Sequence, residues 1–368
     1  MAHETSQNIR GTIKQSVGID CDKDSLVCEL VNEDELGNIT SLSCKTVKNR
    51  ESGFKELLKW VRKLRHGETV LSMVMEATGV YHESAAVFLH SNGMDVKVVL
   101  PNKAMHFQKT ITLKTVTDKV SASSLAVMGI EKKLDNWNPP HPVFNELKQY
   151  SRERNQLLEE QTIIKNQKHA EEHSAWTNAK TIKRYDARLK FIAKQLESIE
   201  EDMRQVVGKE KWLQLKMENI CSIPGIGFIT AISIVSETDG FNLIRNKKQI
   251  TSYAGLDPMK KESGTSVKSK ERISYKGNRN LRKAMHFPAL VAIRKESEHK
   301  QLFIRLVKKH GIKMKAAVAV QRKLLELTYI LWKRDEKYNP NYHQQKVLKN
   351  KGQQENPAAP NELVHDRS

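Results

Sequence analysis

The chain has 368 residues, enough for two or three domains, and it carries 62 lysines and arginines against 43 aspartates and glutamates. The resulting formal net charge of +19 favours a polyanionic partner, most often nucleic acid, and no long apolar segment or basic amphipathic anchor favours a membrane instead. The four cysteines have no CxxC spacing that would indicate a zinc site or a disulfide framework, and the N-terminus has no apolar signal-peptide core. We therefore expect a reduced, cytoplasmic protein, associated with the bacterial nucleoid through its nucleic-acid partner.

The N-terminal third, residues 12–134, has the pattern of an α/β domain. Strands that come first and are then followed by strand–helix alternation suit a mixed sheet with helices on its faces. We expect the domain to end at the stretch 135–142, because consecutive prolines cannot continue a helix. The predicted strands lie near residues 15–20, 25–32, 40–47, 69–76 and 95–100, and the predicted helices near 50–65, 80–92 and 118–134.

Three acidic residues stand at the ends of these predicted elements. Asp20 closes the first strand, Glu76 closes the fourth, and Asp118 begins the helix that runs to about residue 134. Carboxylates carried by two strands and a helix can converge on a pair of Mg²⁺ ions, as in nucleases of the RNase H type, and the ions stabilise the attacking and leaving oxygens of phosphoryl transfer. The alternative is that each acid is a solvated or capping residue.

Residues 143–207 are rich in Glu, Lys, Gln, Leu and Ala and predict a helical arm. In its second half the apolar residues recur at alternating steps of three and four, which is the seam of a coiled coil. A turn at 174–178 would make the arm an antiparallel hairpin that positions or dimerises the domains. The string His169-Ala170-Glu171-Glu172-His173 matches a zinc-hydrolase signature, but such strings arise easily in a Glu-rich helix, so we do not favour zinc chemistry.

A second, mostly helical globular part is predicted at 215–333, and a polar tail without apolar periodicity, expected to be disordered, at 337–368. The tight Pro-Gly-x-Gly turn at 223–227 is similar to a helix-hairpin-helix, whose backbone N–H groups bind a DNA phosphate. Gly225 and Gly227 are therefore candidate nucleic-acid-binding residues.

Ser263 precedes a glycine in a polar loop of this part, surrounded by cations. A serine hydroxyl beside many cations is suited to attack a phosphate, because the cations stabilise the charge that develops during the transfer. The alternative is a loop that only binds the DNA backbone. The candidate nucleic-acid-binding residues around the serine are Lys260, Lys261, Lys268, Lys270, Arg272, Lys276, Asn278, Arg279 and Arg282.

Taken in order, these motifs resemble those of one transposase family, the DEDD recombinases of the insertion sequence one-ten family, which are relatives of the Piv-type DNA invertases. The resemblance spans roughly residues 15–333 and has several motifs in the same order, which makes it far more specific than any one of them. The motifs that look like the family's N-terminal domain are residues 17–20, 76–79 and 114–120, and those that look like its C-terminal domain are 223–227, 252–256, 263–264 and 277–282.

The resemblance implies a RuvC-like, RNase H-type domain, a coiled-coil arm and a C-terminal transposase domain. It implies that Asp20, Glu76 and Asp118 hold Mg²⁺ and that Ser263 is a nucleophile that forms a covalent serine–DNA phosphodiester. It further implies a structured non-coding guide RNA, the bridge RNA, which pairs with both target and donor DNA while a protein tetramer brings them together. The activity would then be excision and insertion of an insertion sequence by site-specific recombination.

The chain departs from the family pattern at one position. The family's fourth acid follows the third by three residues, one helical turn on, and here that position is Ser121. We expect three carboxylates plus the Ser121 hydroxyl or a water to coordinate the metal, because the other motifs, including Ser263, are intact; a protein impaired in cleavage is the alternative. Two other functions also stay open: a Piv-like invertase without guide RNA, and a non-catalytic nucleic-acid-binding protein.

Overall fold

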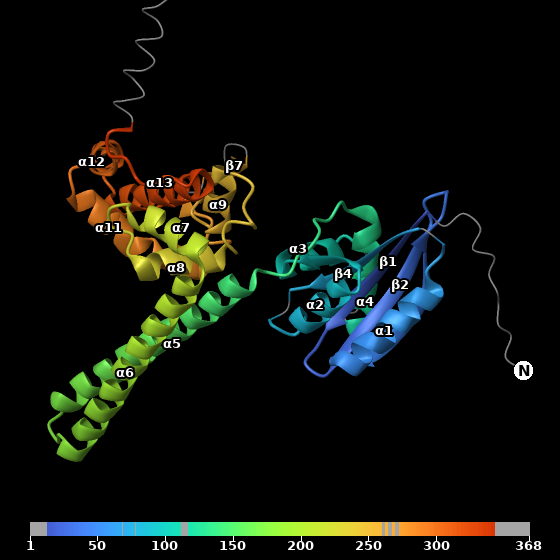
Figure 1. Ribbon diagram of the computed structural model, residues 1–368, viewed down its shortest axis with the longest axis horizontal. Helices are drawn as coiled ribbons and strands as arrows, with labels where there is room; N and C mark the ends of the chain where they lie inside the picture. The colour runs from blue at the N-terminus through green and yellow to red at the C-terminus, as the bar shows by residue number, and fades with distance from the viewer. Residues whose placement is uncertain are drawn as a thin grey trace, which may run out of the picture. The chain divides into compact units, whose positions relative to one another are not determined.

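The computed structural model describes residues 13–67, 69–77, 79–111, 117–259, 262–263, 267–268 and 272–342 (Figure 1). The chain divides into two compact units, Met1–Pro139 and Pro140–Ser368, so the boundary falls inside the predicted proline-rich break. No helix in the described ranges is long and apolar enough to cross a membrane.

The first unit is built on a five-stranded sheet with the strand order β3-β2-β1-β4-β5. The strands are β1 (Lys14–Cys21), β2 (Ser25–Glu33), β3 (Ile39–Lys48), β4 (Val70–Glu76) and β5 (Asp95–Val99). The first three pair antiparallel, whereas β4 is parallel to β1 and β5 is parallel to β4. This order and these directions are those of an RNase H-type sheet, so the predicted RuvC-like fold is confirmed.

Helices cover both faces of this sheet. On one face, α1 (Glu51–Leu64) and α2 (Glu83–Ser91) pack on alternate strand residues such as Val17 and Ile19. On the other face lie α3 (Pro101–Gln108), which the sequence did not predict, and α4 (Asp118–Glu131). Successive residues of a strand therefore contact helices on opposite faces of the sheet, because strand side chains alternate between the two faces.

Gly18 is the point at which α4 presses most closely on the sheet. A Cβ atom at this position would lie 1.9 Å from the carbonyl oxygen of Ala122 and 2.4 Å from the backbone nitrogen of Ala126. Only glycine permits that approach, because any side chain would collide with helix backbone rather than with a movable side chain. The glycine thus fixes the helix that begins at Asp118 against the strand that carries Asp20.

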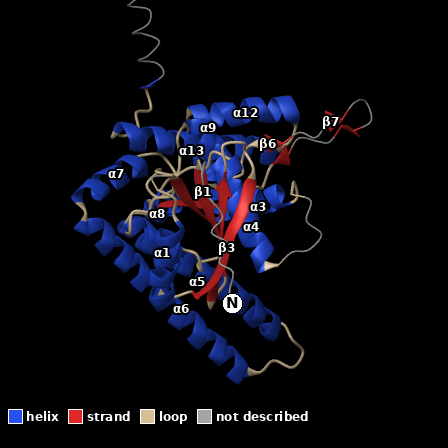
Figure 2. Cartoon of the chain, turned by 90° about the vertical axis from the view of Figure 1, so that its right-hand side faces the viewer, coloured by secondary structure: helices blue, strands red, loops and turns tan. Residues whose placement is uncertain are grey.

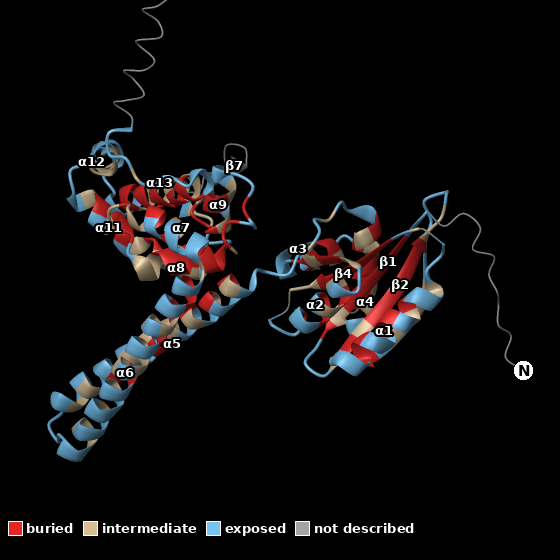
Figure 3. Ribbon diagram, in the orientation of Figure 1, coloured by how far each residue is buried: buried red, intermediate tan, exposed pale blue. Residues whose placement is uncertain are grey.

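The second unit begins with two long helices, α5 (Pro142–Glu172) and α6 (Ala179–Lys209), joined by a short connection close to the predicted turn. Arg154 of α5 pairs with Glu200 at 2.8 Å, and Lys168, further along α5, pairs with Asp186, which lies earlier in α6. The two helices therefore run antiparallel and form a helical hairpin. Buried residues concentrate at its base, whereas its outer end is largely exposed (Figure 3).

The remaining helices form a globular body around the base of that hairpin. They are α7 (Lys211–Cys221), α8 (Phe228–Glu237), α9 (Lys247–Tyr253), α10 (Arg279–Ala284), α11 (His286–Arg294), α12 (Glu298–His310) and α13 (Lys313–Arg334). Phe144 and Leu147 of α5 are buried in the same apolar cluster as Ile220 and Trp332. The arm and the C-terminal helices, expected as separate parts, thus share one core.

A small hairpin interrupts this helical body where the sequence predicts a loop. The strands β6 (Pro258–Met259) and β9 (Arg272–Ile273) pair at its base, and β7 (Glu262–Ser263) and β8 (Val267–Lys268) pair further out (Figure 2). Each strand has two residues, too few for a hydrophobic period to be read. This hairpin carries the predicted nucleophile in β7.

The start of the predicted tail packs on the body. The backbone N–H of Tyr338 donates to the Ser222 hydroxyl at 2.7 Å, and the Tyr338 ring lies against the core. The remainder of the predicted tail, 343–368, lies outside the described residues.

Candidate active site

Asp20 and Glu76 come from adjacent parallel strands. In the β1–β4 pairing Ile19 lies opposite Met75, so the next residue of each strand, Asp20 and Glu76, reaches the same carboxyl edge of the sheet. Side chains two residues apart in a strand lie on the same face of the sheet, so Asp20 lies on the face of Gly18 and Glu76 on the face of Val74. Gly18 contacts α4, and Val74 packs in the cluster of α3 and α4. Both carboxylates therefore belong to the face that α4 covers.

Asp118 completes this group from the first residue of α4. The hydroxyl of Thr117, the N-cap, accepts a hydrogen bond from the backbone N–H of Val120 at 3.3 Å, which fixes the start of the helix. The pKa of Asp20 is raised to about 6, first by burial and then by the negative charges of Asp118 and Glu76. The structure thus brings the three predicted acids close enough for their charges to interact.

Ser121 lies one helical turn after Asp118 and is half-buried. One turn further along the helix, Leu125 is buried in the cluster that includes Val74 of β4. Ser121 therefore lies toward the sheet side of α4, below the exposed Asp118. That is the placement expected of the position at which the family pattern has its fourth acid.

Asp20, Glu76 and Asp118 lie near one another, but they do not form a complete coordination sphere for a metal ion. Among the residues that the structure describes, no three carboxylate, histidine or cysteine side chains are placed so as to bind a metal ion. What the acids do supply is a set of oxygen donors whose mutual repulsion a divalent cation would relieve, which is the donor chemistry that Mg²⁺ prefers. His169 and His173 of the zinc-like string stack on each other, with ring centroids 4.1 Å apart, on an exposed part of the arm.

A buried histidine of the first unit was not predicted from the sequence. His82, at the N-cap of α2, is 7% exposed, and its Nδ1 has no hydrogen-bond partner among the described residues. Burial lowers the pKa of His82, which favours the neutral ring. A lone histidine next to a tyrosine carries no spacing signal, so the sequence could not have identified it.

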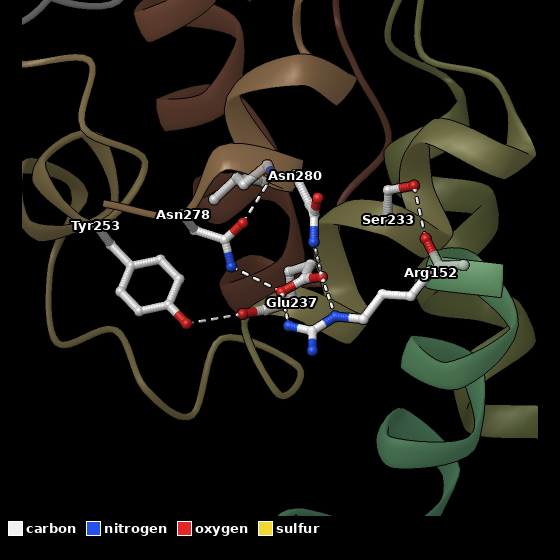
Figure 4. A network of polar contacts seen from close by, with 8 residues as sticks. Arg152, Ser233, Glu237, Tyr253, Asn278 and Asn280 are labelled. Atoms are coloured by element: carbon white, nitrogen blue, oxygen red, sulfur yellow. Dashed lines mark hydrogen bonds and ion pairs between the residues drawn. The ribbon is translucent and has the colours of Figure 1, made fainter. Parts of the chain in front are cut away.

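A second polar cluster lies in the C-terminal unit, around the carboxylate of Glu237 at the end of α8 (Figure 4). Its side chain is 1% exposed. Arg152 of α5 donates to it twice, from Nε to Oε1 at 3.0 Å and from Nη2 to Oε2 at 3.2 Å. Asn278 donates from Nδ2 to Oε2 at 2.7 Å, and Asn280 from Nδ2 to Oε1 at 2.9 Å.

These four hydrogen bonds determine the charge of the buried acid. Burial alone would raise the pKa of Glu237, but the hydrogen bonds from Arg152, Asn278 and Asn280 outweigh burial and hold that pKa below its usual range. The carboxylate is therefore ionised at neutral pH and acts as a fixed acceptor. It joins α5, α8 and the start of α10 at one point.

The same region closes the base of the hairpin. The backbone N–H of Asn278 donates to the carbonyl of Tyr253 at 2.7 Å, and that of Tyr275 to Gly255 at 3.2 Å. A Cβ atom at Gly277 would lie 2.5 Å from the Tyr253 oxygen and 2.6 Å from the Gly255 nitrogen, so this approach requires glycine. The sequence motifs 252–256 and 277–282 are thus neighbours in space, and the chain between them is the hairpin that carries Ser263.

The structure describes the predicted nucleic-acid-binding residues unevenly. For Ser263 and Lys268 it describes only the backbone, and Lys260, Lys261 and Lys270 lie outside the described residues. Asn278 and Arg282 bond within the protein; Arg282 donates from Nη1 to the carbonyl of Ala254 at 2.7 Å. The exposed members of the set are Arg272, Lys276 and Arg279.

The predicted glycine-rich turn links α7 to α8. Gly225 has a φ of 94°, and a Cβ atom there would lie 2.8 Å from the carbonyl oxygen of Pro288 in α11. Packing therefore explains this glycine without a phosphate. Gly227 is the N-cap of α8 and has open space around it, so its phosphate-binding role, like the helix-hairpin-helix character of the turn, stays a prediction.

Comparison with known families gives two matches on the chain. The IS110 model of DEDD transposases matches residues 17–170, and the model described as "Transposase IS116/IS110/IS902 family" matches residues 217–303. The first covers the acid-bearing unit and α5. The second covers α8, α9, the hairpin, and Glu237 with its partners Asn278 and Asn280.

Curated relatives extend over nearly the whole chain. The pilin gene-inverting protein of Moraxella lacunata is 24% identical over 332 residues, which cover 90% of this chain and 99% of that protein. The protein of the same name from Moraxella bovis is 25% identical and covers 81% of this chain. The transposase for insertion sequence element IS1111A of Coxiella burnetii is 28% identical over 33% of this chain and 34% of its own length.

Among solved structures, the chain is similar to RuvC of Thermus thermophilus, in complex with a Holliday junction substrate (10% identity, TM-score 0.26) and alone (13% identity, TM-score 0.27). Each covers 33% of this chain and 99% of RuvC. At these scores the strand order, rather than the superposition, identifies the fold of the first unit. The two family models instead identify the chain: it belongs to the IS110 family of DEDD transposases and is a DNA recombinase.

Proposed function

We propose that this recombinase excises and inserts an insertion sequence by Mg²⁺-dependent phosphoryl transfer, through a covalent intermediate on Ser263. The observation that carries the proposal is the convergence of Asp20, Glu76 and Asp118: burial first, and then the charges of Asp118 and Glu76, raise the pKa of Asp20 to about 6. Three carboxylates held close together destabilise one another, and a divalent cation bound between them would relieve that repulsion.

Asp20, Glu76 and Asp118 would hold the metal, and the hydroxyl of Ser121 or a water would supply a neutral oxygen. When bound, Mg²⁺ would stabilise the negative charge that develops on the attacked phosphate. The residues themselves set the geometry: Asp20 is held by its pairing with Val27 of β2 and Glu76 by its pairing with Val99 of β5. Asp118 is held by the packing of α4 on Gly18.

The serine step would conserve the phosphodiester. The Ser263 hydroxyl oxygen attacks the phosphorus and loses its proton to a base, while the bond from phosphorus to the leaving deoxyribose oxygen breaks and that oxygen takes up a proton. Attack of a deoxyribose hydroxyl from another strand on the adduct reverses these changes and restores the serine. One bond of the same kind forms for each that breaks, so the recombinase needs no nucleotide triphosphate.

The DNA partners would be chosen by a structured guide RNA encoded beside the gene. The diffuse positive charge supports this part of the proposal, because a protein that leaves sequence choice to base pairing mainly needs contacts to phosphates. A tetramer would hold the donor and target DNA together. RNA copurified from the native locus, sequenced and mapped to the flanking DNA, tests the guide, and light scattering tests the assembly.

A second function, site-specific DNA inversion without a guide RNA, is favoured by one observation. Relatives named pilin gene-inverting proteins align with this chain over 99% and 91% of their own length. Protein isolated from its native locus with no element-encoded RNA bound would support inversion and contradict the guided reaction.

Ser263→Ala tests the chemistry. The variant should bind nucleic acid as the wild type does but give no covalent protein–DNA adduct on a denaturing gel, because alanine lacks the attacking oxygen. Ser266→Ala removes the next serine in the sequence, three residues after Ser263, and should retain the adduct. Peptide mapping that places the adduct on Ser266, or recombination through free 3′-hydroxyl ends without any adduct, would contradict the proposal.

A further inference from the structure

A pocket of about 390 Å³ lies between the base of the hairpin and the corner where α12 meets α13. Its apolar lining comes from both sides and includes Leu256, Ile273, Ala316 and Ala319. Leu256 and Ala316 are buried, so this floor belongs to the core and is preformed. The volume falls in the range of small-ligand sites, roughly 300–1,000 Å³.

The polar lining of this pocket is cationic. The cations Arg272, Lys315 and Arg322 line it together with His310, and none of its described lining residues is acidic. The Nε of Arg322 is buried and has no hydrogen-bond partner among the described residues. Because the charged residues of the described lining are all cationic, the pocket favours an anionic ligand.

Tyr275 lines the same pocket in an unusual backbone conformation. Its φ is 54°, in the left-handed region that a bulky residue rarely adopts, and the residue is 64% exposed, so it is not held in that conformation by burial in the core. The guanidinium of Arg282 lies 5.4 Å from the ring centroid. The backbone thus presents an aromatic ring to solvent at the edge of a preformed, cation-lined pocket.

We propose that this pocket binds one unpaired base of the DNA strand that Ser263 attacks. The inference rests on the proposed function, because strand exchange leaves bases beside the cut without their partners, and the hairpin that carries Ser263 forms one wall of the pocket. The apolar floor and the Tyr275 ring suit the two faces of a base, and the cations suit its flanking phosphates. A flat apolar group joined to an anion is the chemistry of a nucleotide.

Two fluorescent probes of equal charge separate base binding from phosphate binding: a short oligothymidine and an abasic deoxyribose-phosphate strand of the same length. The full-length wild type should bind the base-bearing strand about 10-fold more tightly, the preference expected of one stacked base. Tyr275→Ala, at an exposed residue, and Ala319→Trp, which fills the pocket, should bring this ratio close to one. Arg322→Ala should weaken the binding of both strands.

Ile304→Trp is the matched control, because Ile304 is an exposed residue of α12 outside the pocket lining. It should leave the ratio unchanged. Tyr275→Asn separates binding from folding: asparagine adopts the left-handed conformation readily, so the melting temperature should hold or rise while the base preference disappears. If the tyrosine were purely structural, the melting temperature of Tyr275→Asn would fall and the base preference would remain.

Three outcomes would overturn the assignment. The first is an unchanged ratio in both Tyr275→Ala and Ala319→Trp. The second is a change of molecular mass in light scattering for Ala319→Trp, which would assign the pocket to contact between copies of the chain. The third is a base preference for oligouridine but not oligothymidine, which would assign it to RNA. Ser263→Ala should keep the preference, so a failure of the serine chemistry and a failure of the pocket are distinguishable.

Discussion

Arg152 and Glu237, 85 residues apart in the chain, form a two-bond ion pair between the first helix of the arm and the end of α8. The carboxylate is 1% exposed and the guanidinium side chain 50% exposed, so the arginine reaches from the surface to an acid in the core. Because Asn278 binds the same carboxylate, a displacement of α5 would alter the hydrogen bond that holds Asn278 at the base of the hairpin.

We expect Arg152→Ala to destabilise the second unit by about 2 kcal/mol, because it leaves a buried charge with fewer donors; the half-exposed arginine lowers the figure from that of a fully buried pair. Adduct formation should fall further than DNA affinity, since the hairpin loses its anchor. Unfolding in urea and adduct yield at saturating DNA measure the two effects.

Arg154→Ala is the matched control. Arg154 pairs with Glu200 at 2.8 Å within the arm and does not contact the Glu237 cluster, so its loss should cost less than about 1 kcal/mol and leave adduct yield unchanged. Equal effects of the two variants on adduct yield would show that the Arg152–Glu237 pair does not position the hairpin.

The raised pKa of Asp20 predicts a pH-dependent stability. The carboxyl titrates at about 6 in the folded protein and at 3.8 as an isolated group, so between these values the folded state binds more protons, and stability is lost as the pH rises through this window. Asp20→Asn should therefore stabilise the metal-free first unit at pH 7.5 by on the order of 1 kcal/mol, a figure reduced for partial solvent screening.

The measurement is hydrogen exchange of the β1 amides in the wild type and Asp20→Asn at pH 7.5 and pH 4, without divalent cations. The stability difference should be present at pH 7.5 and absent at pH 4. Added Mg²⁺ should narrow it, because the ion stabilises only the ionised site. If the stability of the wild type and that of Asp20→Asn differed by the same amount at both pH values, charge repulsion would be excluded as the cause.

Substitution of the acids should separate chemistry from binding. Asp20→Ala, Glu76→Ala and Asp118→Ala should each abolish strand transfer and leave nucleic-acid affinity largely intact, because losing one carboxylate misplaces the ion while the phosphate contacts remain. Ser121→Asp should preserve or raise activity, since it restores the family's fourth acid. Strand-transfer assays at several Mg²⁺ concentrations test this, and full activity of Asp118→Ala would remove Asp118 from the site.

Gly18→Ala should disrupt the first unit, because its Cβ atom would meet the helix backbone at Ala122, which cannot rotate away. We expect a loss of at least about 1–3 kcal/mol and a displaced α4. Gly208→Ala, near the end of α6 with open space around it, makes the same chemical change and should stabilise by about 0.5–1 kcal/mol. Thermal unfolding measures both, and a neutral Gly18→Ala would show that α4 is free to shift.

The sheet and its acids were predictable because their signals are local. Both β1 and β4 have a run of apolar residues, and Asp20 and Glu76 mark where those runs stop. The helix α3 was not predicted because it is short and buries only Ala104 and Phe107, too few residues to show a period.

The cluster at Glu237 could not be predicted from the sequence. Its partners Arg152, Asn278 and Asn280 lie 85, 41 and 43 residues away, and an acid at the end of a helix resembles a solvated residue until the fold buries it. The pocket beside Tyr275 could not be predicted for the same reason, because its walls come from segments that only the tertiary structure brings together.

The packing of α4 on Gly18 has a consequence for how such a site can diversify. Two of its carboxylates are fixed by a hydrogen-bonded ladder, in which a shift of one residue would turn each side chain to the opposite face. The third carboxylate and Ser121 lie on a helix, where a substitution at one position changes the number and charge of the oxygen donors and leaves the strands in register. In the proposed metal site the strands would thus set where an ion lies, and the helix would set how strongly it is held. Metal preference would then be open to evolutionary adjustment at α4 while the geometry of β1 and β4 is kept.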